Sequence, residues 1–230
     1  GQQMAARYIA DEFKQYNLEG PVKGQDTSYF QRFELVNSRI EEHYFVANGD
    51  TLNVFNEFFP YGHFQSPHKE AEIVFGGYGL DEEHYSDYDQ IDVKGKGVAI
   101  LSGEPMHQDS TYLISGSKEP SEKAGNREKI RLAKEKGAQF VILIMESNKT
   151  FRSKNSIYKS YLQKPRLGLK KPEDKQFGIF YTAPSYGAKL LGTSTNKLEK
   201  LASKTARKGK SYAGKLKNKA GMSFTLDTKP

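Results

Sequence analysis

The stretch IVFGGYGLDEEHYSDYDQIDVKGKGVAIL, residues 73–101, holds two short apolar runs separated by an acidic segment rich in glycine and tyrosine. The first run, Ile73-Val74-Phe75, leads directly into Gly76-Gly77, and the second, residues 98–101, is continuously apolar. A continuous apolar run of this length is typical of a strand buried on both faces. The stretch therefore predicts two core strands joined by a turn whose glycines permit backbone conformations that side chains resist.

The residues that follow predict a helix and a further strand. Residues 121–136 place Ala124, Ile130 and Ala133 on one helical face, and Gly137 is suited to end the helix. Residues 140–145 form another continuous apolar run. Strand, helix and strand in this order predict a right-handed parallel crossover.

Upstream, the pattern predicts one helix and three strands. Residues 2–18 carry apolar side chains at helical spacing, and Gly20-Pro21 ends the helix. Residues 29–35 alternate like a half-buried strand. Residues 42–47 and 51–55 predict a hairpin, because Asn48-Gly49 supplies the positive φ angles that a tight turn requires.

Downstream, we expect a strand over residues 177–181 and a short helix over residues 185–191, capped by Ser185 and closed by Gly192. A last helix covers residues 196–208, with Leu198, Leu201 and Ala202 facing inward, and a last strand covers residues 222–226. The basic segment 149–176 shows no clear period, which predicts a long loop.

Composition excludes several classes of chemistry. The 230 residues carry a formal charge of +7, are 36% hydrophobic and 27% charged, and include no cysteine. Such a balance is typical of a folded globular chain, and it excludes disulfides, thiolate metal sites and cysteine nucleophiles. No run approaches the ~18 apolar residues of a membrane span. Because the sequence begins inside a helical pattern and stops just after a strand-like one, we expect it to be part of a longer protein.

The acidic segment 76–92 is the first candidate metal site, with side chains that include Asp87, Asp89 and Asp92. It does not fit a calcium loop counted from Asp87, because Ile91 takes the fifth position and the glycine and glutamate expected later are missing. Dense charge usually marks an exposed face. We therefore expect a solvated turn, in which Tyr78, Tyr85 and Tyr88 pack their rings and leave their hydroxyls at the surface.

Two other fragments resemble zinc ligands. Glu41-Glu42 precedes His43, and His107-Gln108-Asp109 has the His-x-Asp spacing of binuclear zinc sites. Strand alternation would point Glu42 and His43 to opposite faces. All five histidines lie at or before position 107, so the C-terminal half has no imidazole to contribute.

No nucleophile or phosphate loop stands out either. Ser115-Gly116-Ser117 lacks the glycine frame of a nucleophile elbow, and Gly209-Lys210-Ser211 lacks the upstream glycine of a phosphate loop, which is replaced by Lys204. Between residues 189 and 219 basic residues are frequent and Glu199 is the only acid. This segment could attract nucleic acid or an anionic surface, but Tyr212 is its only aromatic residue, and we favour solvated lysines.

The order of these elements resembles the protease-associated domain of secreted zinc aminopeptidases. The residues that carry the resemblance are the glycine-tyrosine run 73–80, Tyr85-Ser86-Asp87-Tyr88, and the Val-Lys-Gly-Lys entry at residues 93–96. Residues 123–142 resemble the next helix and strand of that domain, and residues 181–191 its closing part. The implied fold is α+β, a sandwich-like or open barrel with a βαβ crossover, flanking helices and an N-terminal helix.

The N-terminal residues 3–13 and 29–33 are similar to the first helix and strand of the peptidase core in the same glutamate carboxypeptidase-like metallopeptidase family. The resemblance implies two regions: residues 1–40 from the peptidase core, and residues 41–230 as the protease-associated insert with the basic loop 149–176. In the family the zinc ligands follow the insert. Here Glu41-Glu42 precedes His107-Gln108-Asp109 and no later histidine exists, so we assign no catalytic, cofactor-binding or metal residue to this chain.

The resemblance implies a non-catalytic domain beside the active-site cleft of a zinc-dependent aminopeptidase, which would itself hold the zinc. Its partners would be the peptidase core and, at the cleft, a peptide substrate, with no nucleic acid and no membrane span, in a periplasmic or extracellular setting. One alternative is a stand-alone module that binds a peptide or glycan through residues 149–176. Another is nucleic-acid binding through the basic face 189–219.

Overall fold

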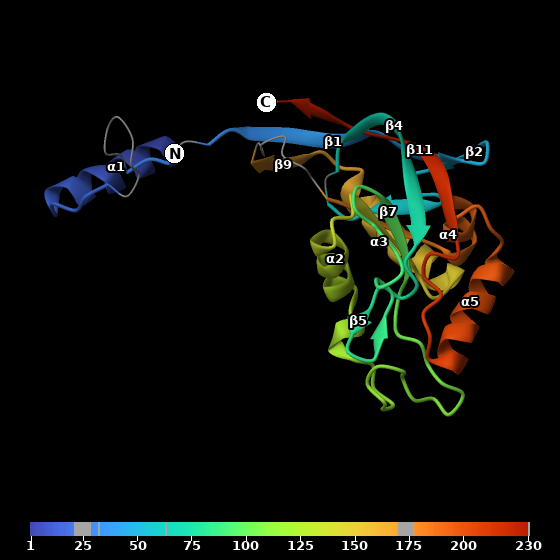
Figure 1. The fold of residues 1–230 in the computed structure, drawn as a ribbon. Helices are drawn as coiled ribbons and strands as arrows, with labels where there is room; N and C mark the ends of the chain where they lie inside the picture. Colours follow the sequence, from blue (N-terminus) through green and yellow to red (C-terminus); the bar gives the residue numbers. More distant parts are fainter. Residues whose placement is uncertain (21–28, 32, 63, 170–176, 230) are drawn as a thin grey trace.

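In the computed structural model, which describes residues 1–20, 29–31, 33–62, 64–169 and 177–229, a mixed β-sheet curls into a nearly closed barrel (Figure 1). Nine described strands follow the order β2-β1-β11-β4-β7-β8-β10-β3, with β9 paired to β1. A bridge between Val54, the residue after β2, and Phe58 of β3 connects the two ends of this order. The strands are β1 (Leu35–Ala47), β2 (Asp50–Asn53), β3 (Phe58–Pro60), β4 (Ser66–Phe75), β7 (Gly97–Leu101), β8 (Phe140–Ile144), β9 (Arg166–Leu169), β10 (Gly178–Thr182) and β11 (Lys217–Lys229).

Four neighbouring strands, β4, β7, β8 and β10, run parallel and form the centre of the sheet. The 3-10 turn η1 (Glu122–Ala124) and helix α2 (Asn126–Glu135) connect β7 to β8, and Gly137 follows with a φ of 85°. The predicted strand, helix and parallel strand over residues 98–145 are confirmed. The predicted fold class, α+β with an open barrel and an N-terminal helix, is confirmed as well.

The continuous apolar runs of β7 and β8 are explained by burial on both faces of the sheet. Val98, Ile100, Val141 and Leu143 pack with Ala133 of α2 on the outer face. The alternate residues of the same strands point into the barrel, because side chains along a strand alternate with a period of two. They include Ala99, Phe140, Ile142 and Ile144.

Phenylalanine side chains fill the interior of the barrel. Phe180 and Phe224 stack with ring centroids 4.7 Å apart, and Phe45 meets both edge-on at 5.2 Å and 5.0 Å. Phe58, Phe64 and Phe140 extend the same cluster. Edge-to-face and offset contacts of this kind contribute stability beyond the burial of apolar area.

The hairpin predicted around Asn48-Gly49 is confirmed. Strands β1 and β2 pair from Ala47 with Asp50, so Asn48 and Gly49 form a two-residue turn. Their φ angles are 53° and 84°, as a turn compatible with strand twist requires.

Five helices are described: α1 (Gln2–Gln15), α2, α3 (Asn148–Leu162), α4 (Pro184–Leu190) and α5 (Thr195–Lys208). The last of these agrees with the predicted helix over residues 196–208, and Leu198 and Leu201 are buried as expected. Ser185 does not cap α4. Ala183 occupies the N-cap position and Pro184 the first turn, where its missing N–H costs nothing.

Two predictions of local structure are wrong. Residues 149–169 are not a loop: Ser147 caps α3 by accepting a hydrogen bond from the Thr150 amide, and β9 then pairs with β1. Residues 170–176, the rest of the predicted loop, lie outside the described part of the chain. The strand predicted over residues 29–35 begins only at Leu35, and its earlier described residues are irregular.

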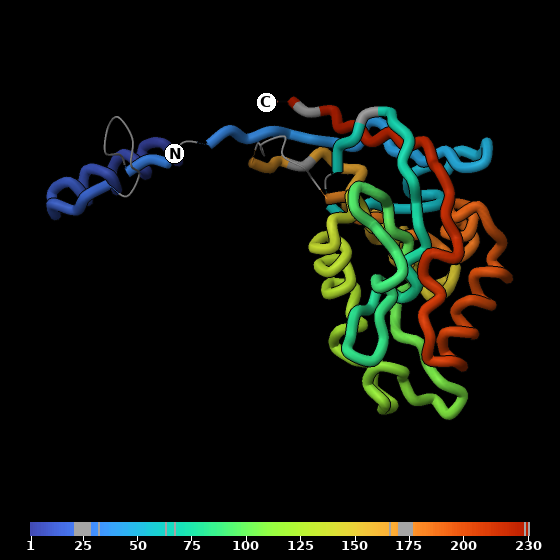
Figure 2. Tube along the Cα trace, viewed as in Figure 1, coloured from blue at the N-terminus to red at the C-terminus, as the bar shows by residue number. Residues whose placement is uncertain are grey.

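Helix α1 stands apart from the barrel, and the chain returns from it into β1 (Figure 1). The outer ends of β1 and β11 lie side by side and project from the same edge of the barrel (Figure 2). They are paired in register from Asn37 with Lys229 inward. The expected boundary between residues 40 and 41 falls within β1, at a shift in this register between Ile40 and Glu42.

Candidate functional site

The acidic segment 76–92 lies at the carboxyl end of β4, where the other parallel strands also end. In open α/β sheets this edge is where ligands usually bind. Here it is covered by loops and by buried polar side chains, including Asp87, Ser102, Glu104 and Lys129. Segment 76–92 includes a short hairpin of β5 (Asp81–Glu82) and β6 (Tyr85–Ser86).

Asp87 is the centre of this polar cluster and is fully buried. Its carboxylate accepts hydrogen bonds from the Tyr78 and Leu80 amides at 2.9 Å and 3.2 Å, from the Tyr85 hydroxyl at 2.7 Å and from the Ser211 hydroxyl at 2.5 Å. Burial raises the pKa of this carboxyl group, and the four donors oppose that rise. The predicted solvated turn is therefore wrong at its central residue, although Glu83, His84, Asp89 and Asp92 are exposed.

The tyrosines of the segment also differ from the prediction. Tyr85 and Tyr88 are buried, and the Tyr85 hydroxyl points to Asp87 instead of the surface. Burial, followed by the nearby Asp87 charge, raises the pKa of Tyr78 to about 12. Because these rings and hydroxyls are enclosed, they stabilise the turn and are not positioned to contact a ligand.

Gly77 shows why the turn needs glycine. Its φ is 58°, and a Cβ atom at this position would lie 2.2 Å from a carboxylate oxygen of Asp87. The backbone must therefore approach the carboxylate with no side chain in between. Gly77 is thus explained by the Asp87 cluster, whereas a Cβ atom at Gly76 or Gly79 would collide with side chains of β7, Val98 or Ile100.

Lys129, on α2, is a second buried charge at the same edge, with 1% of its surface exposed. Its Nζ donates to the Leu101 carbonyl at 2.9 Å and to the Gly103 carbonyl, and it lies 5.6 Å from the centre of the Tyr78 ring. Burial lowers its pKa to about 7, while the charges of Asp87, Glu104 and Glu146 act in the opposite direction. The side chain holds the loop after β7 against the helix.

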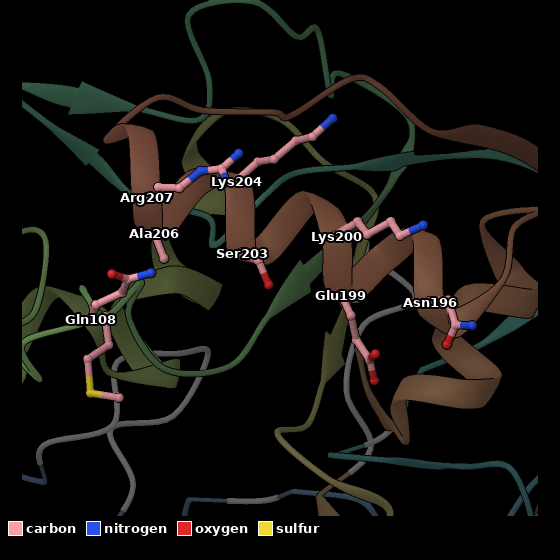
Figure 3. A pocket seen from close by; sticks show the side chains of 9 residues that line it. Gln108, Asn196, Glu199, Lys200, Ser203, Lys204, Ala206 and Arg207 are labelled. Atoms are coloured by element: carbon pink, nitrogen blue, oxygen red, sulfur yellow. The ribbon is translucent and has the colours of Figure 1, made fainter.

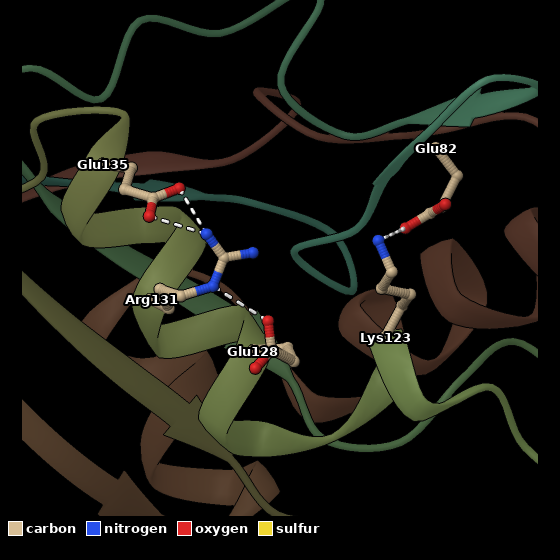
Figure 4. Close-up of polar contacts among 5 residues, drawn as sticks. All are labelled: Glu82, Lys123, Glu128, Arg131 and Glu135. Carbon is tan, nitrogen blue, oxygen red and sulfur yellow. Dashed lines mark hydrogen bonds and ion pairs between the residues drawn. The ribbon is translucent and has the colours of Figure 1, made fainter.

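Glu104 fixes the long loop that follows β7. Its carboxylate accepts from the amides of Ile114, Ser115 and Ser121, at 2.5 Å, 3.0 Å and 2.7 Å. Two ion pairs add contacts near the surface: Lys123 lies 3.5 Å from Glu82 (Figure 4), and Lys136 lies 2.6 Å from Asp81. The whole cluster therefore ties three loops to α2 and to the segment after α5.

The remaining sequence candidates do not meet. His43 is buried with its ring edge-on to Phe224, whereas Glu42 is exposed and accepts from the Ser223 hydroxyl. Asp109 accepts from the Thr111 hydroxyl and amide, which lowers its pKa, and so belongs to a turn. Within the part of the chain that the structure describes, no three histidine, aspartate or glutamate side chains are grouped to hold a metal ion.

The two nucleophile-like and phosphate-like fragments are turns. Ser115 and Ser117 both donate to the Glu119 carbonyl, around Gly116 at a φ of 62°. Gly209 ends α5 in the left-handed conformation, and Ser211 bonds to Asp87. Sequence reasoning missed this role of Ser211, because its partner lies 124 positions earlier in the chain.

Two exposed features remain as candidates for interaction. One is the apolar face of α1, where Met4 and Tyr8 are 77% and 66% exposed, together with Tyr16 at its C-cap, which is 72% exposed. The other is a groove along α5, with a volume of about 670 Å³, bordered by Met106 and Gln108 of the loop after β7 (Figure 3). Across the described helices, none is long and apolar enough to cross a bilayer.

Comparison with known proteins gives structural likeness only. No protein-family model and no curated sequence match the chain. Among solved structures it is similar to an aminopeptidase from Aneurinibacillus sp. strain AM-1, at 14% identity and a TM-score of 0.41 over 99% of this chain. It is also similar to BSAP, a zinc aminopeptidase from Bacillus subtilis, at 14% identity and a TM-score of 0.39 over 98% of this chain. The chain spans 39% of the length of each of these structures.

Proposed function

We propose that this chain is a non-catalytic module of the protease-associated type, carried by a zinc-dependent exopeptidase of the aminopeptidase class. In this proposal it lies beside the active-site cleft of its host and influences substrate access or protein contacts. The host, not this module, holds the zinc ion, which would activate a water molecule for peptide hydrolysis. We propose a periplasmic or extracellular location for the same protein.

The observation that carries the proposal is the set of exposed apolar side chains on α1. Ala10 is the one buried side chain of this helix, while Met4, Tyr8, Ile9 and Phe13 are exposed, although Phe13 meets the Tyr29 ring at 5.9 Å. Burying one large apolar side chain contributes about 1.5–3 kcal/mol. A helix with four such side chains in water is expected to pack against another surface, and a peptidase core is the surface that the sequence resemblance implies.

The pairing of β1 with β11 supports the same proposal. The strand that leads into the barrel and the strand that leads out are neighbours, paired from Asn37 with Lys229. When the segments through which a chain enters and leaves a domain lie close together, that domain can be inserted into another domain without distortion of either. The module would then be held to its host by one two-stranded connection and by α1.

The buried polar cluster supports a scaffold function and not a catalytic one. Asp87, Glu104 and Lys129 direct their charges at backbone groups and at buried hydroxyls. The hydroxyl of Ser102, which follows β7, is itself buried. A substrate would have to displace these loops before it reached any of these groups.

Hydrogen exchange of the 230-residue chain tests the proposal at α1. We expect the amides of α1 to exchange within seconds, because most of its large apolar side chains are exposed, and the amides of β7 and β8 to be strongly protected. Helix α5 serves as the internal control, because one of its faces is exposed and the other buries Leu198 and Leu201. If α1 were protected as strongly as α5, its apolar side chains would already be packed against other residues of this chain. The proposed docking of α1 on a host would then be wrong.

The alternative of a stand-alone module that binds a peptide or glycan through residues 149–176 rests on a loop that the structure replaces with α3 and β9 over residues 149–169. No described feature of that segment favours it over the first proposal.

A further inference from the structure

The geometry points to a second site: we propose that the groove along α5 binds an extended acidic peptide segment. The groove is lined on one side by the outer face of α5 and at one end by Met106 and Gln108. This proposal does not depend on the function proposed above, because it concerns a different surface.

The charges of the groove are arranged in a stripe. Lys200, Lys204 and Arg207 project from one side of α5, whereas Asn196, Glu199 and Ser203 point to the other (Figure 3). The three cations are exposed. Their spacing of four and three residues places them on one helical face.

These cations have no acidic partner within the described part of the chain, in contrast to others on the surface, although Lys204 Nζ lies 6.0 Å from the centre of the Tyr212 ring. Arg131 bridges Glu128 and Glu135 on α2 (Figure 4), and Lys189 lies 2.9 Å from Asp50. Among the described residues, no acidic side chain forms an ion pair with Lys200, Lys204 or Arg207. The helix dipole favours Arg207 in the last turn, and the Tyr212 ring lies next to Lys204, but neither accounts for Lys200 in the middle of the helix.

The spacing of the lysines fits an extended peptide. Four residues of helix span about 6 Å, and alternate residues of an extended strand lie about 6.6 Å apart. A peptide with acidic residues at alternate positions can therefore pair one carboxylate with Lys200 and the next with Lys204. Gln108, Asn196 and Ser203 offer hydrogen-bonding groups for its backbone, and Met106 and Ala206 supply apolar contact.

A peptide fits this groove better than a nucleic acid does. None of the lining residues is aromatic, so the groove offers no surface on which bases could stack. The carboxylate of Glu199 would repel phosphate groups but can accept hydrogen bonds from peptide amides.

Binding of a fluorescent peptide that alternates glutamate with serine, measured by anisotropy, tests the proposal on the 230-residue chain. The variant Lys200→Glu/Lys204→Glu is expected to weaken binding at least about tenfold, since one exposed ion pair alters affinity by up to about fivefold. The matched control Lys154→Glu/Lys159→Glu, on the exposed face of α3, changes the net charge equally and should stay within about twofold of the unmodified chain.

The position of the peptide can be checked independently, because the chain has no cysteine. An environment-sensitive dye attached to Ser203→Cys should respond to the peptide, and the same dye at Ser153→Cys on α3 should not. Three results would overturn the proposal. They are no peptide binding at low salt, an equal loss in both charge variants, and displacement of the peptide by single-stranded DNA at lower concentrations than by unlabelled peptide.

Discussion

Asp87 is the residue on which the turn after β4, the β5–β6 hairpin and the segment after α5 converge. Its four hydrogen-bond donors come from Tyr78, Leu80, Tyr85 and Ser211. The turn after β4 can approach the carboxylate this closely because residue 77 is glycine. A buried acceptor with this many partners is costly to disturb, since each donor left without a partner keeps its full desolvation penalty.

The substitution Asp87→Asn is expected to lower the free energy of unfolding by about 2–4 kcal/mol. The reason is that the side-chain NH2 group of asparagine cannot accept the hydrogen bonds that one carboxylate oxygen of Asp87 accepts. Chemical denaturation monitored by circular dichroism measures the effect. Asp89→Asn, two residues away and exposed, is the control and should change stability by less than about 0.5 kcal/mol. Equal effects from the two substitutions would show that the buried cluster does not hold the turn.

Lys129 provides a pH-dependent test at the same edge. Its pKa is about 7 in the folded chain, whereas a lysine in an unfolded chain titrates near 10.4. Between these values the unfolded state binds more protons, so the stability of the folded chain should rise with pH by up to about 1.4 kcal/mol per unit from this group.

We expect Lys129→Met to remove that rise, so that its free energy of unfolding gains less than that of the unmodified chain between pH 7.5 and pH 9. Lys134→Met, on the exposed side of α2, is the control and should keep the slope of the unmodified chain. Urea titrations at the two pH values give both slopes. If Lys129→Met and the unmodified chain had the same slope, the buried amine would not be the titrating group.

At the scale of single elements, β7 and β8 were predicted from the sequence, whereas α3 was not. The strands β7 and β8 were predictable because the residues of their continuous apolar runs pack on one face of the sheet or the other, and all but the half-buried Leu101 are buried. Helix α3 was missed because its basic residues obscure a sparse apolar stripe of Phe151, Tyr158 and Leu162. That stripe has helical spacing, and Ser147 supplies the cap.

The packing of α3 explains why a weak pattern suffices. Tyr158 stacks on Phe59 with ring centroids 4.8 Å apart, and Phe59 also stacks on Tyr181 of β10. Tertiary contacts of this kind supply most of the stability of a helix in a protein. They come from residues about 100 positions away, which local patterns do not reveal.

Limited digestion with trypsin distinguishes a helix from a loop in this segment. Arg152, Lys154 and Lys159 all lie within α3, and a packed helix should resist cleavage there until the chain unfolds. Phe151→Ala, which removes a buried side chain, should make the same bonds cleavable, whereas Ile157→Ala, at a position 66% exposed, should not. Rapid cleavage after these residues in the unmodified chain would contradict the helix and support the loop predicted from the sequence.

The polar cluster was also only partly predictable, for a related reason. Local spacing identified the acidic segment 76–92 and excluded a calcium loop, but it could not separate Asp87 from its exposed neighbours. The separation depends on Ser211 and on the close approach of Gly77, which are set by the folded barrel.

At the scale of the whole molecule, the chain combines a well-packed barrel with a helix whose apolar face is exposed. The barrel interior is closed by phenylalanines, and the carboxyl edge of its parallel strands is sealed by Asp87, Glu104 and Lys129. The outer surfaces proposed above for interaction are α1, which stands apart from the barrel, and the groove along α5 (Figure 1). Both surfaces belong to the proposed non-catalytic module, and each is tested as part of the proposal that concerns it.

The most direct test of a non-catalytic module is to measure bound zinc and peptidase turnover on the same purified sample. After incubation with zinc and dialysis, we predict less than stoichiometric metal by native mass spectrometry and no hydrolysis of aminoacyl p-nitroanilides above the buffer rate. One or more zinc ions per chain together with measurable turnover would contradict the account.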